Sequence, residues 1–134
     1  MVIVTYLPPF DVIKQSVELS TQKGQLTATA SYDGLIGLIK QLLSGINVDE
    51  IWYSAKYPDI AEAINNGKVA SAKQHFIDNG YFEGRLPFDI VVDDDWYKSQ
   101  YPDVADSISS GAETSSQIHF NRDGYKEGRL PFAV

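Results

Sequence analysis

A stretch of 41 residues occurs twice in this chain, with a constant offset of 44 residues. Between 48–88 and 92–132, 21 of the 41 positions are identical, and no insertion or deletion interrupts the alignment. A register kept over that length indicates two copies of one supersecondary unit. We therefore predict two tandem helical repeats, at residues 48–90 and 91–134, preceded by a distinct unit at residues 1–47.

The first half of each repeat carries the signals of two short helices. Asp49 and Asp93 are suited to the N-cap of the first helix, which has to stop before the proline of the Tyr-Pro-Asp sequence at 57–59 and 101–103. That proline is tolerated in the first turn of a second helix, and the aspartate beside it favours the positive end of the helix dipole. A glycine, at 67 or 111, then closes the second helix.

The second half of each repeat predicts a third helix. We expect it to begin with a capping box, formed by Ser71 with Gln74 in the first copy and by Thr114 with Gln117 in the second. It carries a His-Phe pair near its middle and ends at the following Gly-Tyr pair. Most of the identity between the copies is therefore helix punctuation and aromatic packing, which are requirements of folding.

The first 47 residues have a different pattern. Val2–Leu7 is rich in β-branched and aromatic residues and is followed by two prolines, so we predict a short strand. Residues 12–20 and 25–32 alternate apolar and polar side chains, and the turn sequence Thr-Gln-Lys-Gly at 21–24 lies between them. We expect a β-hairpin, or a three-stranded sheet if the first strand joins it.

An amphipathic helix follows the predicted hairpin. Asp33 is the expected N-cap, the helix runs through Leu43, and Gly45 ends it. Its apolar residues recur at helical spacing and form one stripe, which we expect to cover a face of the sheet. The predicted fold class is α+β, with the sheet and one helix followed by two three-helix repeats.

Charge and composition exclude several classes of protein. The chain has 134 residues, a net charge of −7, no cysteine, and no basic patch of the kind that nucleic acid or an anionic membrane requires. We expect no secretory signal, because residues 1–9 lack a basic region followed by a long apolar one, and no membrane helix, because no apolar run approaches ~20 residues. We expect a cytoplasmic protein without a cofactor, and export by a route that uses no N-terminal signal is the alternative.

Residues 48–132 resemble a known helical repeat of bacterial proteins. The resemblance rests on Tyr101-Pro102-Asp103-Val104-Ala105, His119-Phe120, Gly124 and Glu127-Gly128-Arg129-Leu130-Pro131, and on their counterparts in the first copy. Repeats of that kind accompany glycosyltransferase domains of surface-polysaccharide synthesis and occur in large secreted proteins of the haemolysin-type calcium-binding kind. This chain contains neither partner domain, so the resemblance implies a helical repeat and no particular activity.

The repeats contain two groups of side chains that can bind metal or move protons. His75 and His119 occupy equivalent positions and can serve as metal ligands or general bases. We favour a structural role for both, because catalytic sites are usually built once and these residues are duplicated. In that role each ring is expected to donate a hydrogen bond to a backbone carbonyl or to the aspartate of the Tyr-Pro-Asp sequence. Asp93, Asp94 and Asp95 are candidate Ca²⁺ ligands, although a role in stabilising a helix start explains them sufficiently.

Basic and aromatic residues of the repeats also have two interpretations. Arg85 and Arg129 can bind an anion, but we expect each to form an internal ion pair, with Asp59 and Asp103 respectively. Trp52 and Trp96 are expected to pack in the core. A sugar-stacking platform made of Trp96, Tyr97, Tyr101 and Tyr125 is the alternative.

These observations favour a non-enzymatic interaction or assembly module, an adaptor linked to cell-envelope or polysaccharide machinery. A carbohydrate-binding module that uses the aromatic residues is the alternative, and a small enzyme that uses a histidine is a third possibility. The expected partner is another protein or a second copy, in a homodimer formed through the outer face of the second repeat or through a strand edge near residues 2–7.

Overall fold

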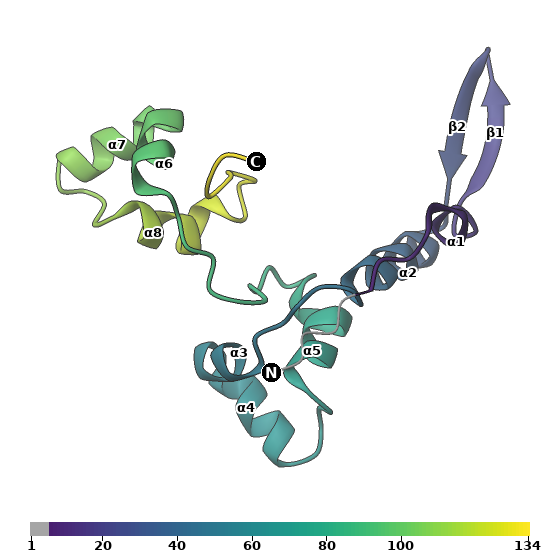
Figure 1. Cartoon of the computed structure of the whole chain (residues 1–134), viewed down its shortest axis with the longest axis horizontal. Helices are drawn as coiled ribbons and strands as arrows, with labels where there is room; N and C mark the ends of the chain where they lie inside the picture. The colour runs from purple at the N-terminus through teal and green to yellow at the C-terminus, as the bar shows by residue number, and fades with distance from the viewer. Residues whose placement is uncertain (1–5) are drawn as a thin grey trace. The chain divides into compact units, whose positions relative to one another are not determined.

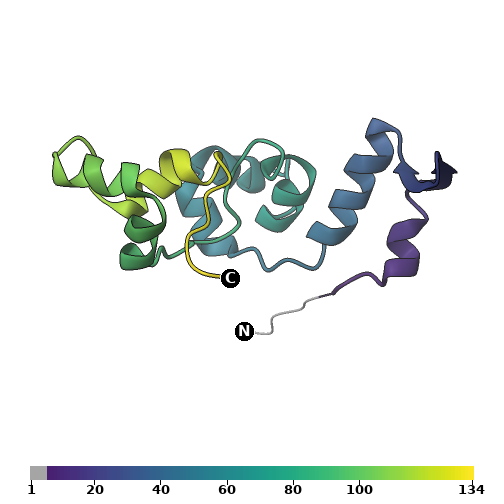
Figure 2. The ribbon, with the colours of Figure 1, turned by 90° about the horizontal axis from the view of Figure 1, so that it is seen from above.

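The computed structural model describes residues 6–134, and its fold class is α+β, as predicted (Figures 1 and 2). The N-terminal part contains α1 (Phe10–Lys14), β1 (Glu18–Gln22), β2 (Gln25–Thr29) and α2 (Tyr32–Leu43). The first repeat contains α3 (Glu50–Lys56), α4 (Pro58–Asn65), α5 (Ala72–His75) and η1 (Phe76–Gly80). The second contains α6 (Asp94–Gln100), α7 (Pro102–Ser109), α8 (Ser116–His119) and η2 (Phe120–Gly124). The segments η1 and η2 are π-helices that continue α5 and α8, so the predicted third helix changes its winding in the middle.

Two compact units make up the chain, Met1–Phe88 and Asp89–Val134. The first unit combines the N-terminal elements with the first repeat, and the second unit consists of the second repeat. Each repeat has its own aromatic core. No helix described for residues 6–134 is both long and apolar enough to cross a bilayer.

The N-terminal elements differ in part from the prediction. Most of the strand expected at Val2–Leu7 lies outside the described residues. The strand expected at 12–20 is wrong in its first half, because α1 occupies Phe10–Lys14 and the strand begins at Glu18. Pro9 precedes α1, and an ion pair between Lys14 and Asp11 (3.2 Å) spans one turn of it.

The hairpin turn is also shorter than predicted. Only Lys23 and Gly24 lie in the turn, with φ of 50° and 76° respectively. Two consecutive left-handed residues are typical of a type I′ turn, whose twist matches that of the flanking strands. Pairing therefore extends up to Gln22 and Gln25.

Two predictions for α2 are wrong. Its N-cap is Ser31, whose Oγ accepts a hydrogen bond from the Gly34 amide (3.0 Å), so Asp33 lies inside the first turn. Its apolar stripe does not cover the hairpin, where nearly every residue of both strands is exposed. The C-terminal half of α2 instead contributes Leu43, with Ile39 packed beside it, to the core of the first repeat.

The helix starts of the repeats follow the predicted N-caps with one exception. The predicted capping boxes are incomplete, because the side chains of Gln74 and Gln117 bond to other residues. Asp49 and Asp93 each accept a hydrogen bond from the amide three residues later, at 3.0 and 3.1 Å. Ser71 caps α5 in the same way. In the second repeat, however, the cap of α8 is Ser115 and not Thr114. The 44-residue offset aligns Ser115 with Ser71, so this identity marked the correct cap.

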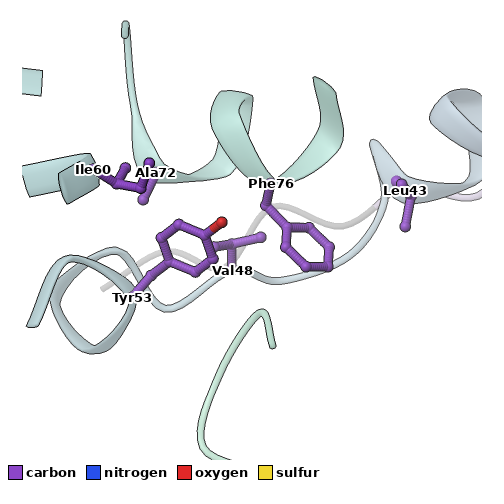
Figure 3. Packing of buried hydrophobic residues seen from close by; sticks show 6 residues of the cluster. All are labelled: Leu43, Val48, Tyr53, Ile60, Ala72 and Phe76. Carbon is purple, nitrogen blue, oxygen red and sulfur yellow. The ribbon is translucent and has the colours of Figure 1, made fainter. Parts of the chain in front are cut away.

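The core of the first repeat is built around Tyr53 and Phe76 (Figure 3). The figure shows Ile60 and Ala72 beside each other, with Phe76 reaching toward Val48. Each of these side chains is at most 7% exposed. The second repeat has a smaller buried set, Tyr97, Val104 and Phe120.

Candidate functional site

Each repeat has one set of polar side chains that extends from its buried tyrosine to the surface, which we call the polar cluster. In the first repeat the cluster consists of Tyr53, Asp59, His75, Glu83 and Arg85. In the second repeat it consists of Tyr97, Asp103, His119, Glu127 and Arg129. All members are identical between the repeats at the 44-residue offset, and their contacts can be compared one by one.

The histidine of each cluster is bonded to the buried tyrosine. His75 Nδ1 lies 2.9 Å from Tyr53 Oη, and His119 Nδ1 lies 2.8 Å from Tyr97 Oη. The sequence suggested a backbone carbonyl or an aspartate as the partner of each imidazole, and this is wrong. The first helix carries its tyrosine toward the start of the π-helix, so the bond ties the first and third helices of a repeat together.

A glycine makes room for that tyrosine. A Cβ placed on Gly80 would overlap Tyr53 Oη, and one placed on Gly124 would overlap Tyr97 Oη. Neither glycine has a positive φ. These residues are therefore required for close packing, and their role is more than that of the helix terminators predicted from the sequence.

The arginine of each cluster forms the predicted internal ion pair. Arg85 donates two hydrogen bonds to the Asp59 carboxylate, at 3.1 and 2.9 Å, and Arg129 donates two to Asp103, at 2.9 and 2.8 Å. Both arginine side chains are 20% exposed. Such bidentate hydrogen bonding is the strong form of a guanidinium–carboxylate contact.

A second tyrosine supports the arginine. The guanidinium of Arg85 lies 4.8 Å from the centre of the Tyr57 ring, and that of Arg129 lies 4.9 Å from the Tyr101 ring. The hydroxyl of Tyr57 accepts a hydrogen bond from the Leu86 amide (2.9 Å). The Tyr-Pro-Asp sequence is thereby held against the loop that ends the repeat.

The environment raises the pKa values of some groups of the cluster and lowers those of others. Burial raises the pKa of Tyr97 to about 12 and also raises that of Tyr53. Hydrogen bonds from Arg85 hold the pKa of the Asp59 carboxyl below its usual range. Burial, and then the nearby Arg85 charge, lower the pKa of His75. Near neutral pH the cluster therefore has a protonated tyrosine, a neutral His75 and an ionised aspartate.

The accessibility of these groups limits their chemistry. Tyr53 is 0% exposed and His75 is 8% exposed. The outer nitrogen of His75 faces Glu83 at 3.6 Å, and Glu83 also contacts Arg85. The surface described for residues 6–134 has no pocket that leads to them. The arrangement holds three helices together.

Two of the three candidate cation ligands have other partners, and the third, Asp95, is exposed. Asp93 caps α6, and Asp94 pairs with Lys98 at 2.7 Å. The pKa of Asp94 is lowered by Lys98 first and by the Ser116 hydroxyl second. Within residues 6–134, no group of three or more His, Asp or Glu side chains is arranged to hold a metal ion.

The aromatic residues proposed for sugar stacking are packed against neighbouring side chains of the second repeat. Tyr97 is 0% exposed, and it cannot present a ring face to a ligand. The Tyr101 ring contacts Arg129, and Trp96 packs edge-on against Tyr101 with 6.2 Å between ring centres. Tyr125 packs against Phe120. Trp52 makes the same edge contact with Tyr57 in the first repeat.

Two polar contacts that sequence reasoning missed belong to the second repeat only. Glu113, which is 7% exposed, accepts a hydrogen bond from Arg122 at 2.6 Å. The Gln117 amide bonds to both Ile90 O (2.8 Å) and Val92 N (2.9 Å). These residues differ from their counterparts at the 44-residue offset, so the repeat pattern did not reveal them.

Comparisons with protein-family models, with curated proteins and with solved structures find no significant match to this chain.

Proposed function

We propose that the chain is a non-enzymatic protein-interaction module, in which the two repeats are the scaffold. The observation that carries this proposal is the polar cluster. The side chains most capable of chemistry are bonded to one another inside each repeat, and the same bonds occur twice. A duplicated set with that geometry is suited to holding helices together.

The distribution of charge supports the N-terminal part as the contact region. Residues 1–47 carry three lysines and three carboxylates, and residues 48–134 carry eight basic and fifteen acidic side chains. The net charge of −7 therefore belongs to the repeats. The N-terminal part also exposes large apolar side chains, among them Phe10 (72%), Leu26 (68%) and Tyr32 (76%). A surface with no net charge and with exposed apolar groups is suited to a protein partner.

The carbohydrate-binding alternative has less support, because Tyr97 is buried and Tyr101 is engaged by Arg129. A connection to cell-envelope or polysaccharide machinery rests on the resemblance of the repeats alone. We retain this connection as part of the proposal because it indicates that a partner should be sought among proteins of that machinery.

Partner capture from cell extract tests the proposed function. The immobilised full chain is compared with the Phe10→Ser variant and with the Ile51→Ser variant, whose side chain is 86% exposed in the first repeat. We expect a protein that the full chain and Ile51→Ser retain and that Phe10→Ser loses. Tryptophan emission during titration with bacterial polysaccharide is the second measurement. A saturable emission shift, without any retained protein, would contradict the proposal in favour of carbohydrate binding.

A further inference from the structure

The hairpin is the one sheet in the part of the chain that the structure describes, and both its edges are open (Figures 1 and 2). An isolated two-stranded hairpin is marginal in water, and three or more strands are needed for independent stability. Open strand edges are also templates for pairing with another chain. The hairpin therefore lacks strands that another molecule can supply.

The two faces of the hairpin differ in polarity. Leu19 and Ala28 are a cross-strand pair, as are Thr21 and Leu26, so these four side chains share one face. Leu19 is 50% exposed and Leu26 is 68% exposed. On the opposite face the Ser20 and Thr27 hydroxyls are bonded at 3.1 Å. A larger sheet built on this hairpin would keep one apolar and one polar face.

The register determines which backbone groups of β2 point outward. The pair that flanks a two-residue turn is hydrogen-bonded within the hairpin, here Gln22 with Gln25. Bonded and non-bonded pairs alternate, so Thr27 also bonds inward to β1. Leu26 and Ala28 then direct their N–H and C=O groups to the free edge.

The free edge of β2 is complementary to itself. When two β2 strands run antiparallel with Thr27 opposite Thr27, Leu26 of each copy lies opposite Ala28 of the other. Both of these residues have outward backbone groups, so they can exchange hydrogen bonds across the symmetry axis. The same register places the apolar faces of both hairpins on one side of a four-stranded sheet.

Charge favours β2 over β1 as the paired edge. Residues 25–29 contain no charged side chain, whereas β1 begins with Glu18. Natural proteins place charges on edge strands to prevent pairing, and β2 lacks this protection. The N-terminal part has no net side-chain charge, so two copies can approach through it without the repulsion that the acidic repeats would produce.

We propose that β2 is a homodimerisation edge, which pairs antiparallel with β2 of a second copy and has Thr27 on the two-fold axis. This inference goes beyond the proposed function, because it adds a second copy of the chain as a partner of the N-terminal part and names the strand edge through which the two copies pair. A pairing of two five-residue strands buries far less than the ~1,600 Å² of a standard interface. The dimer is therefore reversible, and its population rises with protein concentration.

The test is a charge substitution on the symmetry axis with a matched control. Thr27→Lys places two ammonium groups opposite each other across about 4.5 Å between Cα atoms. Ser20→Lys adds the same charge to the same face and removes the same Ser–Thr hydrogen bond, but its copies would lie roughly 14 Å apart, three strand spacings. We expect dimerisation of the full chain to weaken about tenfold or more in Thr27→Lys and to change little in Ser20→Lys, measured by analytical ultracentrifugation.

A complementary pair of variants makes the test specific for register. Thr27→Glu should also weaken the dimer, and an equimolar mixture with Thr27→Lys should restore association as a heterodimer. Amide exchange provides a second readout, because the Leu26 and Ala28 amides should become protected as concentration rises while the Leu19 and Thr21 amides do not. Protection of the β1 amides would place the interface on the wrong edge and overturn the proposal.

Other outcomes also decide the matter. A wild-type chain that sediments as a monomer at every concentration overturns the dimer, and so does equal weakening by Thr27→Lys and Ser20→Lys. Self-association is measured on the purified chain alone, whereas partner capture uses cell extract. A monomer that still retains another protein would therefore overturn the pairing and leave the proposed function standing.

Discussion

The two repeats have the same polar cluster, but different residues surround it. In both, a buried tyrosine is hydrogen-bonded to a histidine and an arginine forms an ion pair with an aspartate. Equivalent hydrogen-bond distances in the two repeats agree within 0.2 Å. The first repeat adds Leu43 from α2 to its core. The second instead ties its leading segment with the Gln117 amide. The comparison shows that the duplicated residues form the polar cluster, while residues that differ between the repeats determine which neighbouring segment packs against each of them.

Residue 77 and its counterpart show how local this difference is. Ile77 packs against the first core, and Asn121, at the same place in the second repeat, accepts a hydrogen bond from Gln117 (3.1 Å). At this position the first repeat thus has an apolar side chain, in the core to which α2 contributes Leu43, and the second repeat has a polar one. Each repeat contains one tryptophan, Trp52 or Trp96, packed on its own core, so the stability of each can be followed separately.

The largest expected effect is a loss of stability when the contact between α2 and the core of the first repeat is removed. Leu43→Ala should destabilise this repeat by about 2–5 kcal/mol, because a side chain that is 4% exposed is removed from a packed core. Urea unfolding followed by Trp52 emission, in a Trp96→Phe background, measures the loss. Leu42→Ala is the control, since Leu42 is 40% exposed and should contribute little. An equal loss reported by Trp96, in a Trp52→Phe background, would show that the repeats unfold together and would remove the distinction between them.

The second prediction concerns the shared polar cluster and should affect both repeats alike. Gly80→Ala and Gly124→Ala should each cost about 1–3 kcal/mol, because the new methyl group overlaps the tyrosine hydroxyl. Tyr53→Phe should reduce the cost of Gly80→Ala, since it removes the atom that is overlapped. Gly37→Ala is the control: nothing lies within 4 Å of a Cβ there, and alanine should stabilise α2 by up to ~1 kcal/mol. A Gly80→Ala chain as stable as wild type would refute the packing role.

The sequence predicted the features of the repeats that follow from local signals. Asp49 and Asp93 cap helices because a carboxylate can accept amide hydrogen bonds at a helix start, which does not depend on the tertiary fold. The Arg85–Asp59 and Arg129–Asp103 pairs could also be anticipated, because each repeat has an arginine near its end and a helix-start aspartate to match it.

The features that the sequence missed depend on three-dimensional packing. The need for glycine at 80 comes from the Tyr53 hydroxyl, 27 positions earlier in the chain, and no local rule connects the two. The stripe of α2 was correctly recognised, but amphipathicity does not state which surface it covers, and Leu43 faces the first repeat instead of the hairpin. Likewise, alternation in residues 12–20 indicated a strand, although the first part of this segment forms α1.

The third prediction compares the stability contributed by the arginine–aspartate pairs of the two polar clusters with that of an exposed ion pair. Arg129→Ala and Arg85→Ala should each destabilise their repeat by about 1–2 kcal/mol, because two charge-assisted hydrogen bonds and a ring contact are lost, while the exposure of the aspartate limits the loss. Lys98→Ala removes an exposed pair with Asp94 and should have no measurable effect. The two tryptophan signals report the two losses. An unchanged melting temperature in Arg129→Ala would contradict the internal role of the guanidinium.

The smallest expected effect is a pH dependence of the first repeat. The folded-state pKa of His75 is lowered by burial and by the Arg85 charge, and the nearby carboxylates Glu83, Asp59 and Asp78 offset this only in part. The unfolded histidine titrates near 6.5. Below that pH the unfolded chain therefore binds a proton that the folded chain binds less readily, so stability falls as the pH decreases. The lowered pKa of Asp59 causes a loss only at more acidic pH, below its ordinary value of 3.8, which separates the two effects.

Melting temperatures at pH values of about 7.5 and 5.5, on either side of the histidine pKa, test this dependence. In a Trp96→Phe background, Trp52 emission should report a lower melting temperature at the acidic pH for the chain with His75 intact. His75→Gln removes the titrating group and should flatten the dependence, although it also loses part of the bond to Tyr53 and lowers stability at both pH values. If the variant keeps the full wild-type slope, the proton uptake belongs to another group, and the buried imidazole is not what makes the first repeat sensitive to acid.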